Sequence, residues 1–108
     1  MRVNLQSVHF AADSKLLEMI ELRIQKLERF FDRIIDVDVV LKLEPTGQVQ
    51  DKIAEIKLNI PGGQIVSKET SKTFENAVIS AVDNLKRRVI RHKEKGISKK
   101  RIDKERLL

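Results

Sequence analysis

The chain has 108 residues, a formal net charge of +6 at pH 7, four phenylalanines, and no cysteine, tryptophan or tyrosine. This length suits a single domain, and the lack of cysteine excludes disulfides and thiolate metal sites and fits a reducing cytosol. No apolar stretch approaches the roughly 20 residues of a membrane-spanning helix. The first ten residues hold no long apolar run, so we expect a cytoplasmic protein without a signal peptide.

The first half of the chain predicts a strand and then a helix. Residues 2–8 alternate apolar and polar side chains, a pattern typical of a strand. Asp13 or Ser14 can then cap a helix that extends to about Arg33. Leu17 and Phe30 flank the apolar stripe of this helix. The stripe itself recurs at spacings of three and four residues and consists of Leu16, Ile20, Ile24, Leu27 and Phe31.

Three strands are predicted next. "DVDVVLKLE", residues 36–44, and "IAEIKLNI", residues 53–60, each place their apolar side chains on one face. "PTGQ", residues 45–48, separates these two strands. "PGG", residues 61–63, suits a type II turn, with proline second and glycine third. Residues 64–70 should therefore return as an antiparallel strand.

A second helix closes the predicted domain. Ser71 can cap it and Gly96 can end it. Residues 1–96 then form one domain, and residues 97–108 a basic tail that we expect to be mobile, because it shows no clear core face. The buried stripe of this helix comprises Phe74, Ala77, Val78, Ala81, Val82, Leu85 and Val89.

The order of elements is strand, helix, three strands, helix. One face of the sheet is apolar, and both helices carry matching stripes. We therefore predict an α+β fold, β-α-β-β-β-α, in which a four-stranded sheet and two helices on one of its faces form a two-layer sandwich.

Support for catalysis is weak. His9 lies at the end of a predicted strand, and His92 lies within the basic run of the last helix. No nucleophile with a candidate base, no metal-ligand spacing and no acidic cluster stands out. "PGG" is too short to cradle a phosphate and is not followed at once by a helix. We therefore expect no enzyme activity, no metal and no cofactor.

The positive charge is concentrated at one end of the chain. Residues 1–50 have a net charge of −1, residues 51–85 of −1, and residues 86–108 of +8. Within residues 86–95 there are six cations and one acid, Glu94. Like charges at helical spacing repel one another by a few tenths of a kcal/mol per pair, roughly. A localised basic block of this kind predicts a polyanionic partner.

On the last helix, Arg87, Arg91 and Lys95 lie four residues apart and share one face, which Lys86 and Arg88 broaden. The first helix carries a second basic row, partly offset by acids at 28 and 32. If the helices pack side by side, the two rows merge into one cationic surface. The second row consists of Arg23, Lys26, Arg29 and Arg33.

The chemistry of this surface favours structured RNA. Aromatic stacking platforms are absent from the sequence, which argues against a reader of single strands. Arginine and lysine without such platforms favour contacts to the backbone phosphates of an RNA that is already folded. A membrane partner is disfavoured, because the outward faces lack apolar anchors.

The whole pattern resembles the ribosome hibernation factors, also called ribosome-associated inhibitors or sigma-54 modulation proteins. The resemblance covers residues 2–96 and rests on four segments in order at the right spacing. They are "KLERFFDRI", "LKLEPTGQV", "LNIPGGQIVSKET" and "TFENAVISAVDNLKRRVIRHKEKG". Such a protein has the β-α-β-β-β-α fold and is not an enzyme.

The resemblance implies a partner and a site. Family members bind the small ribosomal subunit in the channel of messenger RNA and of the A- and P-site transfer RNAs, and silence and protect idle ribosomes in stationary phase or starvation. Family members contact ribosomal RNA through basic residues at positions that correspond here to Arg23, Lys26, Arg29, Arg87, Arg91 and Lys95. We add Arg33, Lys86 and Arg88 to the expected site from their charge and position alone. We expect a short form, in which ribosome dimerisation either needs a second factor or does not occur.

Three alternatives stay open at this point. A double-stranded RNA-binding module also has helices on one sheet face, but it carries its lysines at the start of the last helix, where this chain has only Lys72. An enzyme is the least motivated. A protein-interaction adaptor would use the exposed sheet face, with Val40, Lys42, Lys57 and Lys68.

Overall fold

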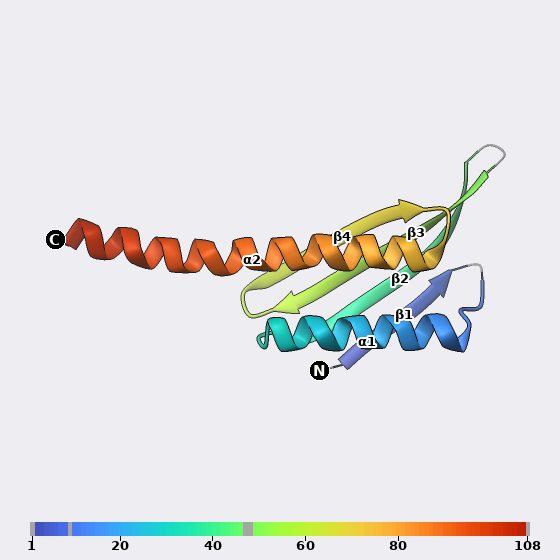
Figure 1. Cartoon of the computed structure of the whole chain (residues 1–108), viewed down its shortest axis with the longest axis horizontal. Helices are drawn as coiled ribbons and strands as arrows, with labels where there is room; N and C mark the ends of the chain where they lie inside the picture. Colours follow the sequence, from blue (N-terminus) through green and yellow to red (C-terminus); the bar gives the residue numbers. More distant parts are fainter. Residues whose placement is uncertain (1, 9, 47–48, 108) are drawn as a thin grey trace.

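The structure is a computed structural model that describes residues 2–8, 10–46 and 49–107, with side chains described for residues 2–8, 10–43 and 51–92 (Figure 1). Its elements follow the predicted order. They are β1 (Arg2–Val8), α1 (Ser14–Phe30), β2 (Asp36–Thr46), β3 (Val49–Ile60), β4 (Gly63–Ser71) and α2 (Phe74–Leu107).

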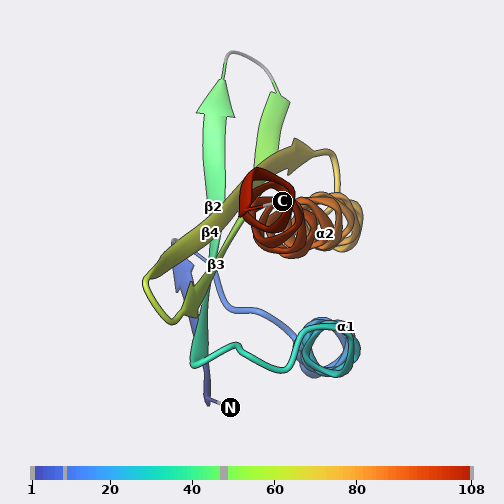
Figure 2. The same cartoon turned by 90° about the vertical axis from the view of Figure 1, so that its left-hand side faces the viewer.

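The four strands form one mixed sheet in the order β1-β2-β3-β4. β1 pairs with β2 in parallel, and the other two pairs are antiparallel. Both helices cover the same face of the sheet, and none of the described residues forms a helix on the opposite face (Figure 2). The predicted two-layer α+β sandwich is therefore confirmed.

The core is a layer of aliphatic side chains between the sheet and the helices. Burying one such side chain fully contributes about 1.5–3 kcal/mol. The alternation in β2 and β3 and the stripes of both helices all point into this layer, as the sequence predicts. Its largest fully buried members are Ile20, Ile24, Leu41, Ile56, Leu58 and Leu85.

Helix α1 begins as predicted and ends earlier. The Asp13 side chain accepts a hydrogen bond from the Leu16 backbone N–H at 2.8 Å, which identifies Asp13 as the N-cap. At the other end Phe31 has an extended backbone and a buried ring, so the chain turns toward β2 there. The predicted end near Arg33 is therefore wrong by one turn, because burying Phe31 takes precedence over continuing the helix.

Two predictions about α2 are wrong. Ser71 is the last residue of β4, and Thr73 caps α2 instead, its hydroxyl oxygen accepting from the Asn76 N–H at 3.1 Å. The helix also continues through Gly96 to Leu107. A glycine inside a helix costs only about 1 kcal/mol relative to alanine, and the flanking Lys and Glu are good helix formers. The domain boundary at residue 96 and the mobility of residues 97–108 stay predictions.

The two hairpins differ in how well the sequence located them. β2 continues through Pro45 to Thr46, which pairs with Val49, so "PTGQ" does not end the strand at its proline. Residues 47–48, the second half of "PTGQ", lie outside the described residues. In the second hairpin Gly62 has φ +86°, and Ile60 pairs with Gly63. This confirms the type II turn.

A polar network joins three strands on the face without helices. Asp38 of β2 accepts hydrogen bonds from the Asn4 side chain of β1 at 3.0 Å and from the Asn59 side chain of β3 at 3.1 Å. Asn59 also donates to Asp36. The two amide donors and, more weakly, the Lys57 charge lower the pKa of Asp38 below its usual range. The ionised carboxylate thus helps to attach the edge strand β1 to the sheet.

We expect Gly62→Ala to lower the free energy of unfolding by about 1–2 kcal/mol, because a left-handed backbone is costly for any residue with a Cβ. Gly63→Ala is the matched control: it adds the same methyl group next door at ordinary φ, and neither new Cβ would meet an atom within 4 Å. Urea denaturation measures both variants. Equal effects of the two substitutions would contradict the assigned turn.

Asp38→Asn should destabilise the protein at neutral pH and lose this effect in acid. Because the pKa of Asp38 is lower in the folded state, its carboxylate stabilises the fold at any pH above its pKa in the unfolded chain, about 3.9. This contribution disappears as the pH falls through the folded-state pKa. The difference in urea midpoint between wild type and variant should therefore shrink from pH 6 toward pH 3. A difference that stays constant over that range would show that the charge on Asp38 does not stabilise the fold.

Candidate functional site

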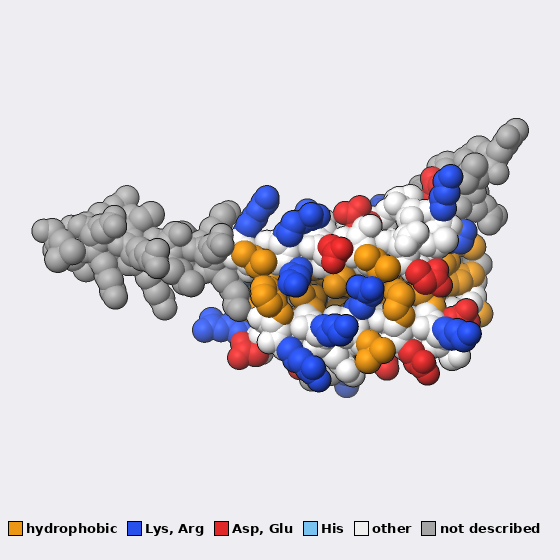
Figure 3. Space-filling view, viewed as in Figure 1, with side chains coloured by type: hydrophobic (Ala, Val, Ile, Leu, Met, Phe, Trp, Pro, Cys, Tyr) orange, Lys and Arg blue, Asp and Glu red, His pale blue; other side chains and the backbone are white. Residues whose placement is uncertain are grey.

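The fold brings the two predicted basic rows together. α1 and α2 lie side by side and run in the same direction, so the C-terminal half of α1 lies beside the turns of α2 that carry Val82 and Lys86, and α2 continues past the end of α1 (Figure 1). At their starts, the ring of Phe10 stacks on that of Phe74 with centroids 4.3 Å apart. The merged cationic surface that the sequence predicted conditionally is thus present, and Figure 3 shows Lys and Arg side chains of both helices on one face of the molecule.

A groove of about 440 Å³ separates the helices. Its floor includes Leu27 of α1 and Val82 of α2, which are both buried core residues. Asp83 is the single acidic residue among those that line it. Cations from both helices also line it: Arg23, Lys26, Arg29 and Lys86.

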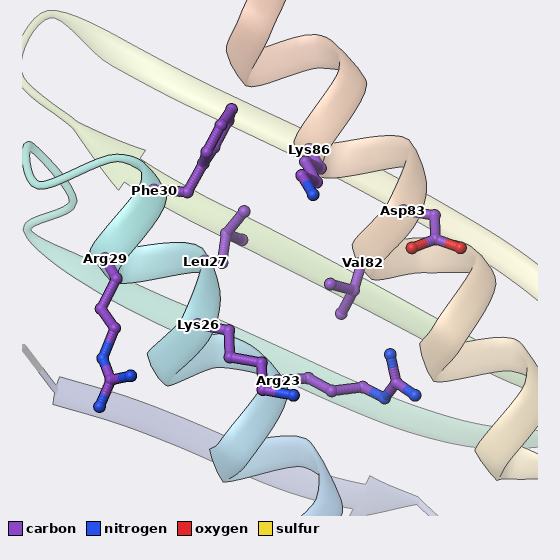
Figure 4. A pocket seen from close by; sticks show the side chains of 8 residues that line it. All are labelled: Arg23, Lys26, Leu27, Arg29, Phe30, Val82, Asp83 and Lys86. Atoms are coloured by element: carbon purple, nitrogen blue, oxygen red, sulfur yellow. The ribbon is translucent and has the colours of Figure 1, made fainter.

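One aromatic ring lies among these cations. Phe30 from α1 and Lys86 from α2 face each other across the groove (Figure 4), with the Lys86 Nζ 5.4 Å from the centre of the ring. Phe30 is 36% exposed. From the sequence we expect Phe30 to flank the core stripe and expect no aromatic platform for base stacking. Successive residues on a helix are rotated by about 100° around its axis. Since Phe31 fits the buried stripe, the periodicity could have predicted that Phe30 lies at the edge of that stripe and is partly exposed.

The other cations of α2 point in different directions. Arg87, Arg88 and Arg91 are all exposed. Arg87 and Arg91 lie one turn apart and share a face of the helix, as predicted. The guanidinium of Arg88 instead donates to the backbone carbonyl of Val66 in β4. Arg88 and Arg91 also line a second groove, of about 290 Å³, along the start of β4.

Two predicted site residues, Arg33 and Lys95, lie outside both groups of described helix cations. Arg33 is exposed but lies in the turn after α1, not on the helix, because α1 ends at Phe30. Lys95 is in α2, and its side chain lies outside the described residues. The structure therefore brings four of the predicted cations into one groove, arranges three around α2, and places Arg33 beside the C-terminal end of α1.

Polar contacts fix α2 against the sheet next to this surface. The side-chain amide of Asn84 donates to the Ser67 hydroxyl of β4 at 3.0 Å and to Glu69 at 3.4 Å. Ser67 is almost fully buried, so this hydrogen bond satisfies a polar group inside the core layer. Together with the Arg88 contact one turn later, it sets the position of the basic segment along β4.

The opposite sheet face has a different character. The alternation that buries Val37 and Val39 places Val40, Lys42, Lys57 and Lys68 on the outer face, as the adaptor alternative requires. Asp38 and Glu55 share that face, and Glu55 pairs with Lys68 in the register of β3 and β4. The outer face thus mixes both signs of charge and lacks the concentration of cations found over the helices.

Within the residues that the structure describes, no group of His, Cys, Asp or Glu could hold a metal ion. None of the helices searched in that part of the chain is long and apolar enough to cross a membrane.

Residues 3–96 match the family described as "Sigma 54 modulation protein / S30EA ribosomal protein". The chain belongs to this family. Proteins named ribosome hibernation promoting factor are similar over most of their length. Those of Pseudomonas putida and Azotobacter vinelandii are 32% identical, covering 88% and 92% of this chain and 89% of each relative. That of Escherichia coli K12 is 30% identical, over 88% of this chain and 96% of the relative.

Solved structures agree with this assignment. The N-terminal domain of Thermus thermophilus Protein Y is 27% identical and has a TM-score of 0.72, covering 85% of this chain and 99% of that domain. A ribosomal subunit interface protein from Coxiella burnetii shares the fold, with a TM-score of 0.78 at 16% identity over 87% of this chain and 99% of that one. Family membership places the chain among ribosome-associated, non-enzymatic proteins.

Arg88 and Arg87 should differ in their effect on stability. Arg88→Ala removes the donor to the Val66 carbonyl and should lower the free energy of unfolding by about 1 kcal/mol. Arg87→Ala removes an equal charge from the same exposed turn and should change stability by less than about 0.5 kcal/mol. Urea denaturation of the two variants tests this, and a larger loss for Arg87→Ala would refute the structural role of Arg88.

Proposed function

We propose that this protein is a ribosome hibernation factor that binds the small ribosomal subunit through the surface formed by α1 and α2. In this proposal it occupies the channel of messenger RNA and of the A- and P-site transfer RNAs, inhibits translation and protects idle ribosomes under stress. The proposal rests mainly on one observation: cations from both helices lie on the same face of the molecule and line one groove. Membership of the ribosome-associated family supports it.

Phosphate contact explains why so many like charges are held together. Basic side chains displace condensed counterions from RNA, and this release drives binding. Both helices present their cations from a rigid, packed scaffold, so little conformational entropy is lost on binding. With about six phosphate contacts the affinity should fall by roughly 10³ between 50 and 200 mM salt.

The placement of the charge separates this proposal from its rivals. Lys72, just before α2, is the cation nearest to the start of that helix, and the arginines lie from residue 87 onward. A double-stranded RNA-binding module instead carries its lysines at the start of the last helix. The outer sheet face carries charges of both signs, so it gives no electrostatic reason to prefer RNA there. The proposed site comprises Arg23, Lys26, Arg29, Arg33, Lys86, Arg87, Arg88, Arg91 and Lys95.

Co-sedimentation with isolated small ribosomal subunits at low and moderate salt tests the proposed function. We expect saturable one-to-one binding that messenger RNA and transfer RNA together displace. Arbitrary duplex RNA serves as the comparison ligand. Binding to subunits no tighter than to that duplex would refute the proposal and favour a general RNA-binding module.

Exposed cations on both faces of the molecule allow a matched pair of double variants. Arg87→Gln/Arg91→Gln removes two exposed cations from the helix face and should weaken subunit binding roughly tenfold or more. The slope of log affinity against log salt should become shallower by about 2. Lys42→Gln/Lys68→Gln removes the same charge from the sheet face and should leave both quantities nearly unchanged. Equal losses for the two double variants would reject the helix face as the binding site.

A further inference from the structure

The groove between α1 and α2 has an apolar floor and an aromatic ring, and phosphate binding alone does not require either, because it needs only the cations at the rim. We propose that this groove seats a single unstacked nucleobase of the bound RNA, with Phe30 as the stacking partner and the cations of both helices holding the adjoining phosphates. This inference rests on the proposed function and names a subsite within it.

The environment of Phe30 motivates the inference. Phe30 is 36% exposed, although the neighbouring Phe31 is buried. Lys86 of α2 lies over the Phe30 ring, and Lys26 and Arg29 are among the cations that line the same groove. A base offers a flat face for stacking, and the sugar that carries it is flanked by charged phosphates; this combination matches an aromatic ring in a groove lined by cations.

The size of the groove fits such an occupant. Its volume of about 440 Å³ lies inside the range of roughly 300–1,000 Å³ that is typical of small-ligand sites. Leu27 and Val82 provide the apolar floor, and both belong to the packed core, so the floor is preformed. In Figure 4 the Arg23 side chain extends from α1 toward α2 across the groove, within reach of a strand that enters it.

Lys86 connects the free and the bound states. In the free protein its ammonium group lies 5.4 Å from the centre of the Phe30 ring. Stacking of a base contributes more than an exposed cation–π contact, so a base can take the place of the ammonium group. Lys86 then becomes available to a phosphate next to that base. Binding of the base and of the phosphate is thus coupled through one side chain.

The balance of charge favours RNA over a peptide as the occupant. Four cations and one acid, Asp83, line the groove. An unpaired base in a loop or bulge of structured RNA can be splayed out and stacked on an aromatic side chain. A protein segment would need both an aromatic side chain and several acids at close spacing. A ribosomal protein found in this groove, in place of RNA, would therefore overturn the inference.

Substitutions at position 30 separate stacking from electrostatics. Phe30→Leu should lower the affinity for isolated small subunits by about 5- to 150-fold, the range for losing one stacked base. The salt slope should stay unchanged, because no cation is lost. Phe30→Tyr retains a ring and should restore binding. Lys86→Gln, in contrast, should make the slope shallower by about 1. Thermal unfolding verifies that each variant is folded.

A cross-linking experiment identifies the occupant directly. A benzophenone amino acid at position 30, irradiated in the complex with small subunits, should produce one dominant stop in primer extension of the ribosomal RNA. The matched control places the same group at Leu22, which is 59% exposed on α1 and does not line the groove. Position 22 should give weak or scattered stops.

The outcomes distinguish this inference from the proposed function. If Phe30→Leu binds subunits like the wild type, or if the cross-link joins only ribosomal protein, the base subsite is refuted while ribosome binding stands. If the wild-type protein does not bind subunits at all, the proposed function itself fails. A dominant stop from position 30 together with rescue by Phe30→Tyr supports the subsite.

Discussion

The aliphatic layer between the sheet and the two helices is the constraint on which the cationic surface depends. Both helices bury their stripes against the same sheet face, so they must lie next to each other. Because the hydrophobic effect has no directional preference, this layer alone would not fix how far α2 slides along β4. The amide of Asn84 on the buried Ser67, and the guanidinium of Arg88 on the Val66 carbonyl, supply that directional information.

The same packing explains how the repulsion between cations is tolerated. Each like-charge pair on a helix costs a few tenths of a kcal/mol, roughly, which is small beside the contribution of each buried aliphatic side chain. Residues such as Leu85 and Val89 anchor the turns of α2 that carry the arginines. The fold can therefore hold a charged surface in place before a partner arrives, and a partner that neutralises it gains the repulsion energy.

The two faces of the molecule have different roles in this account. The helix face combines cations with an apolar groove and one exposed aromatic ring. The sheet face carries charges of both signs, and its network of Asn4, Asp38 and Asn59 joins β1 to β2 and β2 to β3. In the proposed function the polyanion binds on one side of the domain, and the edge strand β1 is held on the other.

The sequence by itself determined the element order, the layer architecture and the turn at Gly62, because hydrophobic periodicity and turn chemistry are local properties of the chain. It also located most of the cations of the proposed site. Tertiary structure decided where α1 ends, since only packing requires the Phe31 ring to be buried where the helix would otherwise continue to Arg33. It also decided that Arg88 contacts β4 and that Phe30 meets Lys86 across a groove. Each of these depends on the distance between elements far apart in the chain, and that distance is set by the packed layer between them.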